Sequence, residues 1–65
     1  MDEKVIAERL KELRGSETQK ETAAAIGVAQ STYAMYETGQ RIPSDDKKIR
    51  IAKYHNKTVQ EIFYD

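Results

Sequence analysis

Four residues near the middle of the chain share one side of a short helical segment and carry groups suited to binding. Gln30 and Ser31 offer an amide and a hydroxyl, and Ala34 and Met35 follow one helical turn later. Amides and hydroxyls donate and accept hydrogen bonds, whereas small or flexible apolar side chains make close apolar contacts. The pattern predicts a recognition surface rather than a reaction centre.

Groups that perform catalysis or hold metal ions are scarce. The sequence has no cysteine and a single histidine, His55, which is expected to be a packed or half-exposed ring. Disulfides and thiolate metal sites are therefore excluded. The sequence also lacks a nucleophile paired with a base, a phosphate-binding loop and a metal-ligand set. We expect a protein that is not an enzyme and that needs no cofactor or metal ion.

Length and hydropathy indicate one small domain without a membrane span. The 65 residues suffice for a single thin core, so we expect one domain over residues 1–65. No apolar run is long enough to cross a membrane, and the charged start, Met1-Asp2-Glu3-Lys4, is unlike a signal peptide. The expected location is the cytoplasm.

Apolar periodicity predicts an all-α fold of five short helices. Ile6, Leu10 and Leu13 recur at i, i+4 and i+7, as on one face of an amphipathic helix, and no segment alternates apolar and polar residues over strand length. The expected helical segments are residues 2–14, 19–26, 30–38, 45–56 and 58–63.

Capping and turn residues place the helix ends. Thr18 with Glu21, and Thr58 with Glu61, fit the capping box, in which a threonine hydroxyl and a glutamate carboxylate satisfy free backbone N–H groups. Gly27 supplies the left-handed conformation that ends a helix. Each predicted boundary thus has a local chemical cause.

Residues 19–38 meet the physical requirements of a helix-turn-helix. Ala23 is small enough to let two helices approach closely, and Gly27 makes the turn. The residues expected to point inward and set the crossing of the two helices are Ile26, Val28, Tyr33 and Tyr36. The second helix then presents its opposite side, which holds Gln30 and Ser31, to the outside.

This pattern resembles the XRE family, the helix-turn-helix of phage Cro proteins and phage repressors. The resemblance runs from about Ile6 to Phe63. It rests on the order and spacing of Thr18-Gln19, Ala23, Gly27-Val28, Tyr36-Glu37-Thr38-Gly39, Arg41, Pro43-Ser44, Ile51-Ala52 and Ile62-Phe63. It implies a lambda-repressor-like domain of a transcriptional regulator, either a whole Cro-like protein or the amino-terminal domain of a longer repressor.

The resemblance also implies roles for individual residues. Base edges in the major groove would be contacted by Gln30, Ser31, Ala34 and Met35. The DNA backbone would be contacted by Gln19, Thr32, Thr38 and Arg41. A structural ion pair would join Arg14 to Glu37. The chemistry agrees, because a glutamine amide pairs with adenine, a serine hydroxyl pairs with several bases, and alanine or methionine touches a thymine methyl group.

The implied partner is a double-stranded, pseudo-palindromic DNA operator, bound by a homodimer at least on DNA. We expect the dimer contact near Ile62, Phe63 and Tyr64, because a short last helix cannot bury all its apolar groups alone. The operator sequence and the direction of regulation are not predicted.

The net charge of the chain argues against DNA binding. Eleven basic residues balance eleven acidic ones, and the pI of about 6.6 is unlike that of a basic nucleic-acid binder. A protein-interaction module, such as an antitoxin or antirepressor, is the alternative. Within residues 19–41, Lys20 and Arg41 are matched by Glu21 and Glu37, so we expect DNA affinity to depend only weakly on salt.

A basic cluster lies farther along the chain, at Lys47, Lys48, Arg50, Lys53 and Lys57. We expect it to form a solvated helix face, with a second DNA-facing or partner-binding surface as the alternative.

Overall fold

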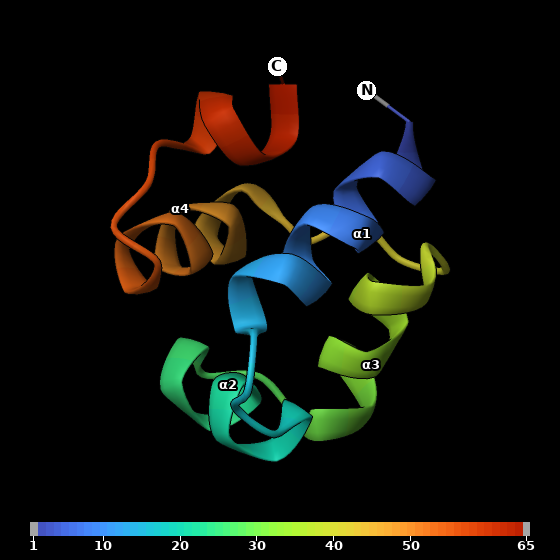
Figure 1. The fold of residues 1–65 in the computed structure, drawn as a ribbon, viewed down its shortest axis with the longest axis vertical. Helices are drawn as coiled ribbons and strands as arrows, with labels where there is room; N and C mark the ends of the chain where they lie inside the picture. Colours follow the sequence, from blue (N-terminus) through green and yellow to red (C-terminus); the bar gives the residue numbers. More distant parts are fainter. Residues whose placement is uncertain (1, 65) are drawn as a thin grey trace.

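The computed structural model describes residues 2–64 as five helical segments without a strand. These are α1 (Glu3–Arg14), α2 (Gln19–Ile26), α3 (Gln30–Thr38), α4 (Asp45–Tyr54) and a short π-helical segment, η1 (Gln60–Tyr64). The predicted all-α architecture is confirmed. In Figure 1, α2 lies below α1 and α3 at its lower right, while α4 and the carboxy-terminal segment lie on the left.

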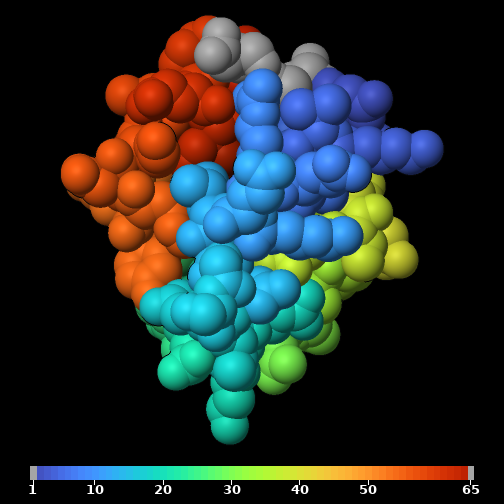
Figure 2. All heavy atoms as spheres, viewed as in Figure 1, coloured from blue at the N-terminus to red at the C-terminus, as the bar shows by residue number. Residues whose placement is uncertain are grey.

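Helix α1 packs mainly against α3 and η1. Asp2 caps it, because its carboxylate accepts a hydrogen bond from the backbone N–H of Lys4 at 2.9 Å. Its buried side is formed by Ile6, Ala7 and Leu10. Figure 2 shows the α1 atoms, in blue, lying against the red carboxy-terminal segment on one side of the molecule. The start and end of the described chain are therefore joined through α1.

Helices α2 and α3 form the predicted helix-turn-helix. The capping box at α2 is complete, since the Glu21 N–H donates to Thr18 Oγ1 at 3.0 Å and the Thr18 N–H donates to Glu21 Oε1 at 2.9 Å. Gly27 follows with φ 78°, in the left-handed region that favours glycine. Its N–H reaches back to the carbonyl groups at the end of α2. The chain can thus reverse direction within a few residues and begin α3.

One core joins all five elements. The residues that form it are Ile6, Leu10, Ala23, Ile26, Tyr33, Tyr36, Ile51, Ala52, Ile62 and Phe63. Leu13, Val28 and Val59 are partly buried against it. All of the apolar residues expected to fix the α2–α3 crossing therefore contact this core.

Helix α4 begins at the expected residue but ends at Tyr54, two residues before the expected end at residue 56. Ser44 accepts a hydrogen bond from the Lys47 N–H at 3.4 Å, and Asn56 after the helix adopts φ 56°. Of the apolar residues on this helix, Ile51 and Ala52 are buried, but Ile49 is 49% exposed. The inward face of α4 is therefore narrower than its composition suggests. No helix within residues 2–64 is long and apolar enough to cross a membrane.

Cations from two other helices hold η1. Arg9 of α1 donates from Nη1 to the carbonyl groups of Glu61 and Ile62, at 3.1 and 3.2 Å. The Lys48 ammonium of α4 lies 4.8 Å from the centre of the Tyr64 ring and donates to its hydroxyl at 2.7 Å. The end of the described chain is thus anchored to both α1 and α4.

The burial of Ile62 and Phe63 removes the reason for expecting a dimer contact at these two residues. Both side chains are buried in the molecule's own core, at 2% and 1% exposed, whereas Tyr64 is 54% exposed. The expectation that η1 could not bury its apolar groups alone is therefore wrong for Ile62 and Phe63. The short segment succeeds because α1 and α4 cover it from two sides.

Candidate nucleic-acid interface

The two sides of α3 are chemically distinct. Tyr33 and Tyr36 face the core and meet edge to face, with ring centres 6.1 Å apart and planes at 77°. Gln30 and Ser31 are exposed on the other side, while Ala34 and Met35 are half-buried. The structure therefore places the four expected base-contacting residues on the side that is not used for packing, although the last two are less exposed than the first.

The first turn of α3 has no side-chain cap. Its capping position is Ala29, which has no side chain able to accept a hydrogen bond, and the first N–H groups of a helix have no partner within it. Gln30 and Ser31 follow directly. Backbone donors and the two most exposed polar side chains of α3 thus lie at the same end of the helix.

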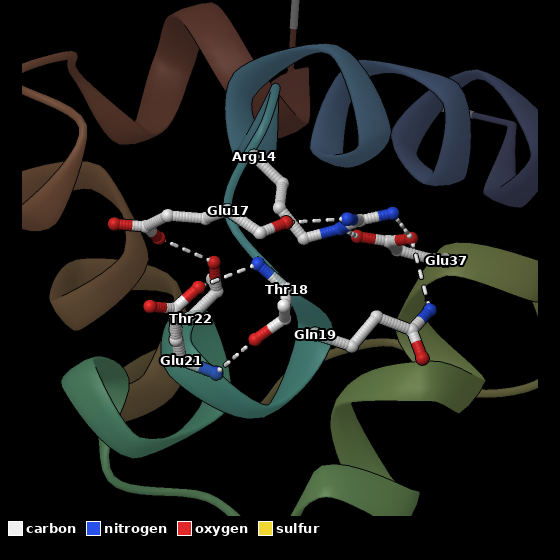
Figure 3. Close-up of polar contacts among 7 residues, drawn as sticks. All are labelled: Arg14, Glu17, Thr18, Gln19, Glu21, Thr22 and Glu37. Carbon is white, nitrogen blue, oxygen red and sulfur yellow. Dashed lines mark hydrogen bonds and ion pairs between the residues drawn. The ribbon is translucent and has the colours of Figure 1, made fainter.

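The opposite end of α3 is held by Glu37, which is only 2% exposed. Arg14 donates from Nε to Glu37 Oε2 at 2.6 Å and from Nη2 to Oε1 at 3.1 Å (Figure 3). The remaining Arg14 nitrogen, Nη1, donates to the Glu17 carbonyl at 2.6 Å. Arg14 and Glu37 thus form the expected ion pair in a two-point geometry that fixes the end of α3 to the end of α1.

Electrostatics supports this pairing. Burial by itself would raise the pKa of Glu37, but hydrogen bonds from Arg14 and neighbouring donors outweigh it, and the pKa lies below its usual value. The same hydrogen bond raises the pKa of Arg14. Burial raises the pKa of Tyr33 beside them. The pair is therefore ionised at neutral pH, with the tyrosine neutral.

Gln19, expected to contact the DNA backbone, is oriented by the same carboxylate. Its Nε2 donates to Glu37 Oε1 at 3.1 Å, and Figure 3 shows the side chain reaching across from α2 to α3. An amide nitrogen carries two hydrogens, so one contact leaves the second available to another acceptor. Gln19 is thus held at the first turn of α2 with its nitrogen fixed.

A second carboxylate, that of Glu17, joins the segment between α1 and α2 to two helices, α2 and α4, and was not expected from the sequence. Its Oε1 accepts from Thr22 Oγ1 of α2 at 2.6 Å, and its Oε2 accepts from the Tyr54 hydroxyl of α4. Hydrogen bonds from Thr22 and Tyr54 lower the pKa of Glu17. The segment between α1 and α2 is therefore fixed in place although it is short and irregular.

Of the remaining residues expected at the DNA backbone, Thr32 and Thr38 belong to α3 and Arg41 follows it. Thr38 is exposed and its hydroxyl donates to the Met35 carbonyl at 3.2 Å. Thr32 and Arg41 line one hollow of about 320 Å³, together with Ala29 and Lys47. This hollow borders the open start of α3.

The charge exposed around α3 differs from the charge counted over residues 19–41 in the sequence. Glu37 is buried and paired with Arg14, which lies outside residues 19–41. Lys20, Glu21 and Arg41 are exposed. The count over residues 19–41 includes both Arg41 and Glu37, but Glu37 is neutralised by Arg14 and does not offset the charge of Arg41 at the surface.

A comparison with protein-family models agrees with this geometry. The model described as helix-turn-helix matches residues 10–62, which include α2, α3 and α4 entirely. No curated protein and no solved structure matches the chain. The match covers most of the chain and contains the two packed helices, the glycine turn and the Arg14–Glu37 pair described above. The chain belongs to the XRE-type helix-turn-helix family of DNA-binding domains.

Proposed function

We propose that this domain binds double-stranded DNA sequence-specifically, as part of a repressor-type transcriptional regulator in the cytoplasm. The observation that carries the proposal is the two-sided character of α3. Tyr33, Tyr36 and Glu37 fix its inner side, whereas Gln30 and Ser31 are exposed on its outer side. A rigidly packed helix with a polar outer side is suited to insertion into the major groove, which admits an α-helix.

Base contacts follow from the chemistry of that side. The Gln30 amide can donate and accept at the same time, which matches the major-groove edge of adenine. Ser31 pairs with more than one base, and the half-buried Ala34 and Met35 suit a thymine methyl group. Each well-formed two-point contact discriminates against a wrong base by about 1–3 kcal/mol.

Backbone contacts would set the position of α3 in the groove. Gln19, with its amide nitrogen fixed by Glu37, is suited to donate to a phosphate. Thr32 and Thr38 on α3, and Arg41 after it, are suited to contact the phosphates that would border the groove. These contacts carry no sequence information, so they should contribute equally to all duplexes.

A dimer would place two α3 helices about 34 Å apart, one turn of DNA, on a pseudo-palindromic site. With Ile62 and Phe63 buried in the protomer, Tyr64 is the only member of the expected dimer contact that is exposed. Sedimentation of the protein with and without its operator tests this arrangement. A monomer on DNA would contradict it.

The proposal is tested by selecting binding sites from a random duplex library. We expect an enriched sequence with two related half-sites. Gln30→Ala and Ser31→Ala should relax the preference at one or two positions, whereas Gln19→Ala should weaken binding to all sequences alike. Gln60→Ala, an exposed glutamine on η1, is the matched control and should change neither.

The zero net charge favours one alternative, a protein-interaction module such as an antitoxin or antirepressor. Failure to enrich any duplex would contradict the DNA-binding proposal and favour this alternative.

A further inference from the structure

The guanidinium group of Arg50 lies against Gly27 in the turn of the helix-turn-helix. If Gly27 carried a Cβ atom, that atom would lie 2.6 Å from Nη1 of Arg50, closer than two such atoms can approach. The guanidinium of α4 thus occupies the space that the missing side chain leaves. Arg50 remains 52% exposed, so its charge is available to a partner at the surface.

A second cation of α4 lies close by. Lys47 lines the hollow of about 320 Å³ that also contains Ala29 and Thr32 of the turn and α3, and Arg41 from the segment after α3. Gly27 borders the same hollow. Three basic side chains from two separate segments therefore gather at the side of the turn from which Gln30 begins α3.

From this juxtaposition we infer that Arg41, Lys47 and Arg50 together bind phosphates of the DNA backbone, so that the DNA-contacting surface extends onto α4. The inference rests on the proposed function. With α3 in the major groove, the phosphates that border the groove run beside the start of α3, because the groove is only about 12 Å wide. We call these three residues the turn-side cations.

The turn-side cations supply the positive charge that residues 19–41 lack. Each phosphate neutralised by a cation contributes about 0.9 to the slope of log affinity against log salt. Two cations on α4, added to Arg41, therefore predict a slope of about 2.7 per protomer, steeper than residues 19–41 alone would give. They also give part of the basic cluster on α4 a role at the DNA, in place of a merely solvated face.

Asp46 weakens the attraction of the turn-side cations for DNA phosphates. Its Oδ2 lies 3.7 Å from Lys47 Nζ and 3.4 Å from Arg50 Nε, so one carboxylate faces both α4 cations. The Asp46 side chain is 68% exposed, which makes these pairs weak and easily exchanged for a phosphate. The Asp46 carboxylate therefore competes with DNA phosphates for Lys47 and Arg50 and lowers the affinity for the DNA backbone.

The experiment measures binding to a random-sequence duplex over a range of salt concentrations. The variants are Lys47→Ala, Arg50→Ala and Asp46→Asn. Lys57→Ala is the control with the same loss of charge, because Lys57 lines a different hollow with Arg9 and Glu12. Circular dichroism melting of each variant checks that the fold is retained.

We expect Lys47→Ala and Arg50→Ala each to reduce the magnitude of the salt slope by about 0.9 per protomer and to weaken binding at low salt. Asp46→Asn should tighten binding at low salt, and Lys57→Ala should leave the slope unchanged. Equal slopes for the unsubstituted protein, Lys47→Ala and Arg50→Ala would overturn the inference, as would an equal reduction by Lys57→Ala.

The inference and the proposed function fail separately. A random duplex reports only backbone contacts, so the slopes test the turn-side cations whether or not the protein prefers a sequence. If the slopes fall as expected but Gln30→Ala and Ser31→Ala change no preference, only the proposed sequence-specific function is contradicted.

Discussion

Arg14 and Glu37 are 23 positions apart in the chain, yet their side chains meet at two points, Nε with Oε2 at 2.6 Å and Nη2 with Oε1 at 3.1 Å. Glu37 also accepts the Gln19 amide. One buried carboxylate therefore links the ends of α1 and α3 and the start of α2. The position of α3 depends on this carboxylate as well as on apolar packing.

Arg14→Ala should destabilise the protein strongly, because it leaves the buried Glu37 charge without its main partner. We expect a loss of about 2–3 kcal/mol, below the range for fully buried pairs since the Arg14 side chain is 22% exposed. Urea denaturation measures it. Arg41→Ala, which removes an exposed arginine, should cost much less, and replacing Arg14 and Glu37 together by methionine should recover most of the loss. A loss for Arg14→Ala no larger than for Arg41→Ala would contradict this role.

Thr18→Ala should lower stability by about 1 kcal/mol, because it removes the hydroxyl that accepts the Glu21 N–H at the start of α2. Thr18→Ser retains the hydroxyl and should stay close to the unsubstituted protein. Thermal melting of the two variants side by side measures the difference. Equal melting temperatures would show that the capping box contributes nothing.

His55 should make stability depend on pH in the mildly acidic range. Burial lowers its pKa from 6.5, although the Glu17 carboxylate acts in the opposite direction. The unfolded chain therefore binds a proton more readily, so this contribution is complete above the unfolded value and is lost as pH falls through the folded one. We expect denaturation midpoints to decline as pH falls below about 6.5 and His55→Leu to flatten that decline. The same decline in both proteins would rule out His55 as its source.

Glu37 should produce a second, more acidic loss of stability. Its folded pKa is depressed below 4.5, so its contribution is fully present above that value and disappears as pH falls toward the folded pKa. We expect Glu37→Gln to be less stable at neutral pH but to lose less stability on acidification. Denaturation at pH values on both sides of 4.5 compares the two proteins. An acid decline of equal size in Glu37→Gln would contradict this assignment.

The local features of the fold could be predicted from the sequence because their causes are local. Thr18, Thr58 and Gly27 act on backbone groups within a few residues of themselves, and the structure contains both capping boxes and the left-handed glycine. The end of α3 agrees with the expected segment for the same reason, because Gly39 after it adopts the left-handed conformation. Boundaries set by caps and turns need no knowledge of the rest of the fold.

Relationships between distant segments could not be predicted in this way. The resemblance to the XRE family implied the Arg14–Glu37 pair, but no pattern indicated that Glu17 would join Thr22 to Tyr54, 37 positions away. Nor did the sequence show that Ile49 would be exposed or that Arg50 would lie on Gly27. These facts depend on how α4 is rotated about its axis, which is set by packing against α2.

The contact between Gly27 and Arg50 links two properties that are usually adjusted separately. An L-amino acid at position 27 would strain the turn, because φ there is 78°, and its Cβ would also push aside the flexible end of Arg50. The first effect concerns folding and the second concerns where a positive charge resides. Variation at position 27 would therefore alter stability and surface potential in one step, without any change in a charged residue.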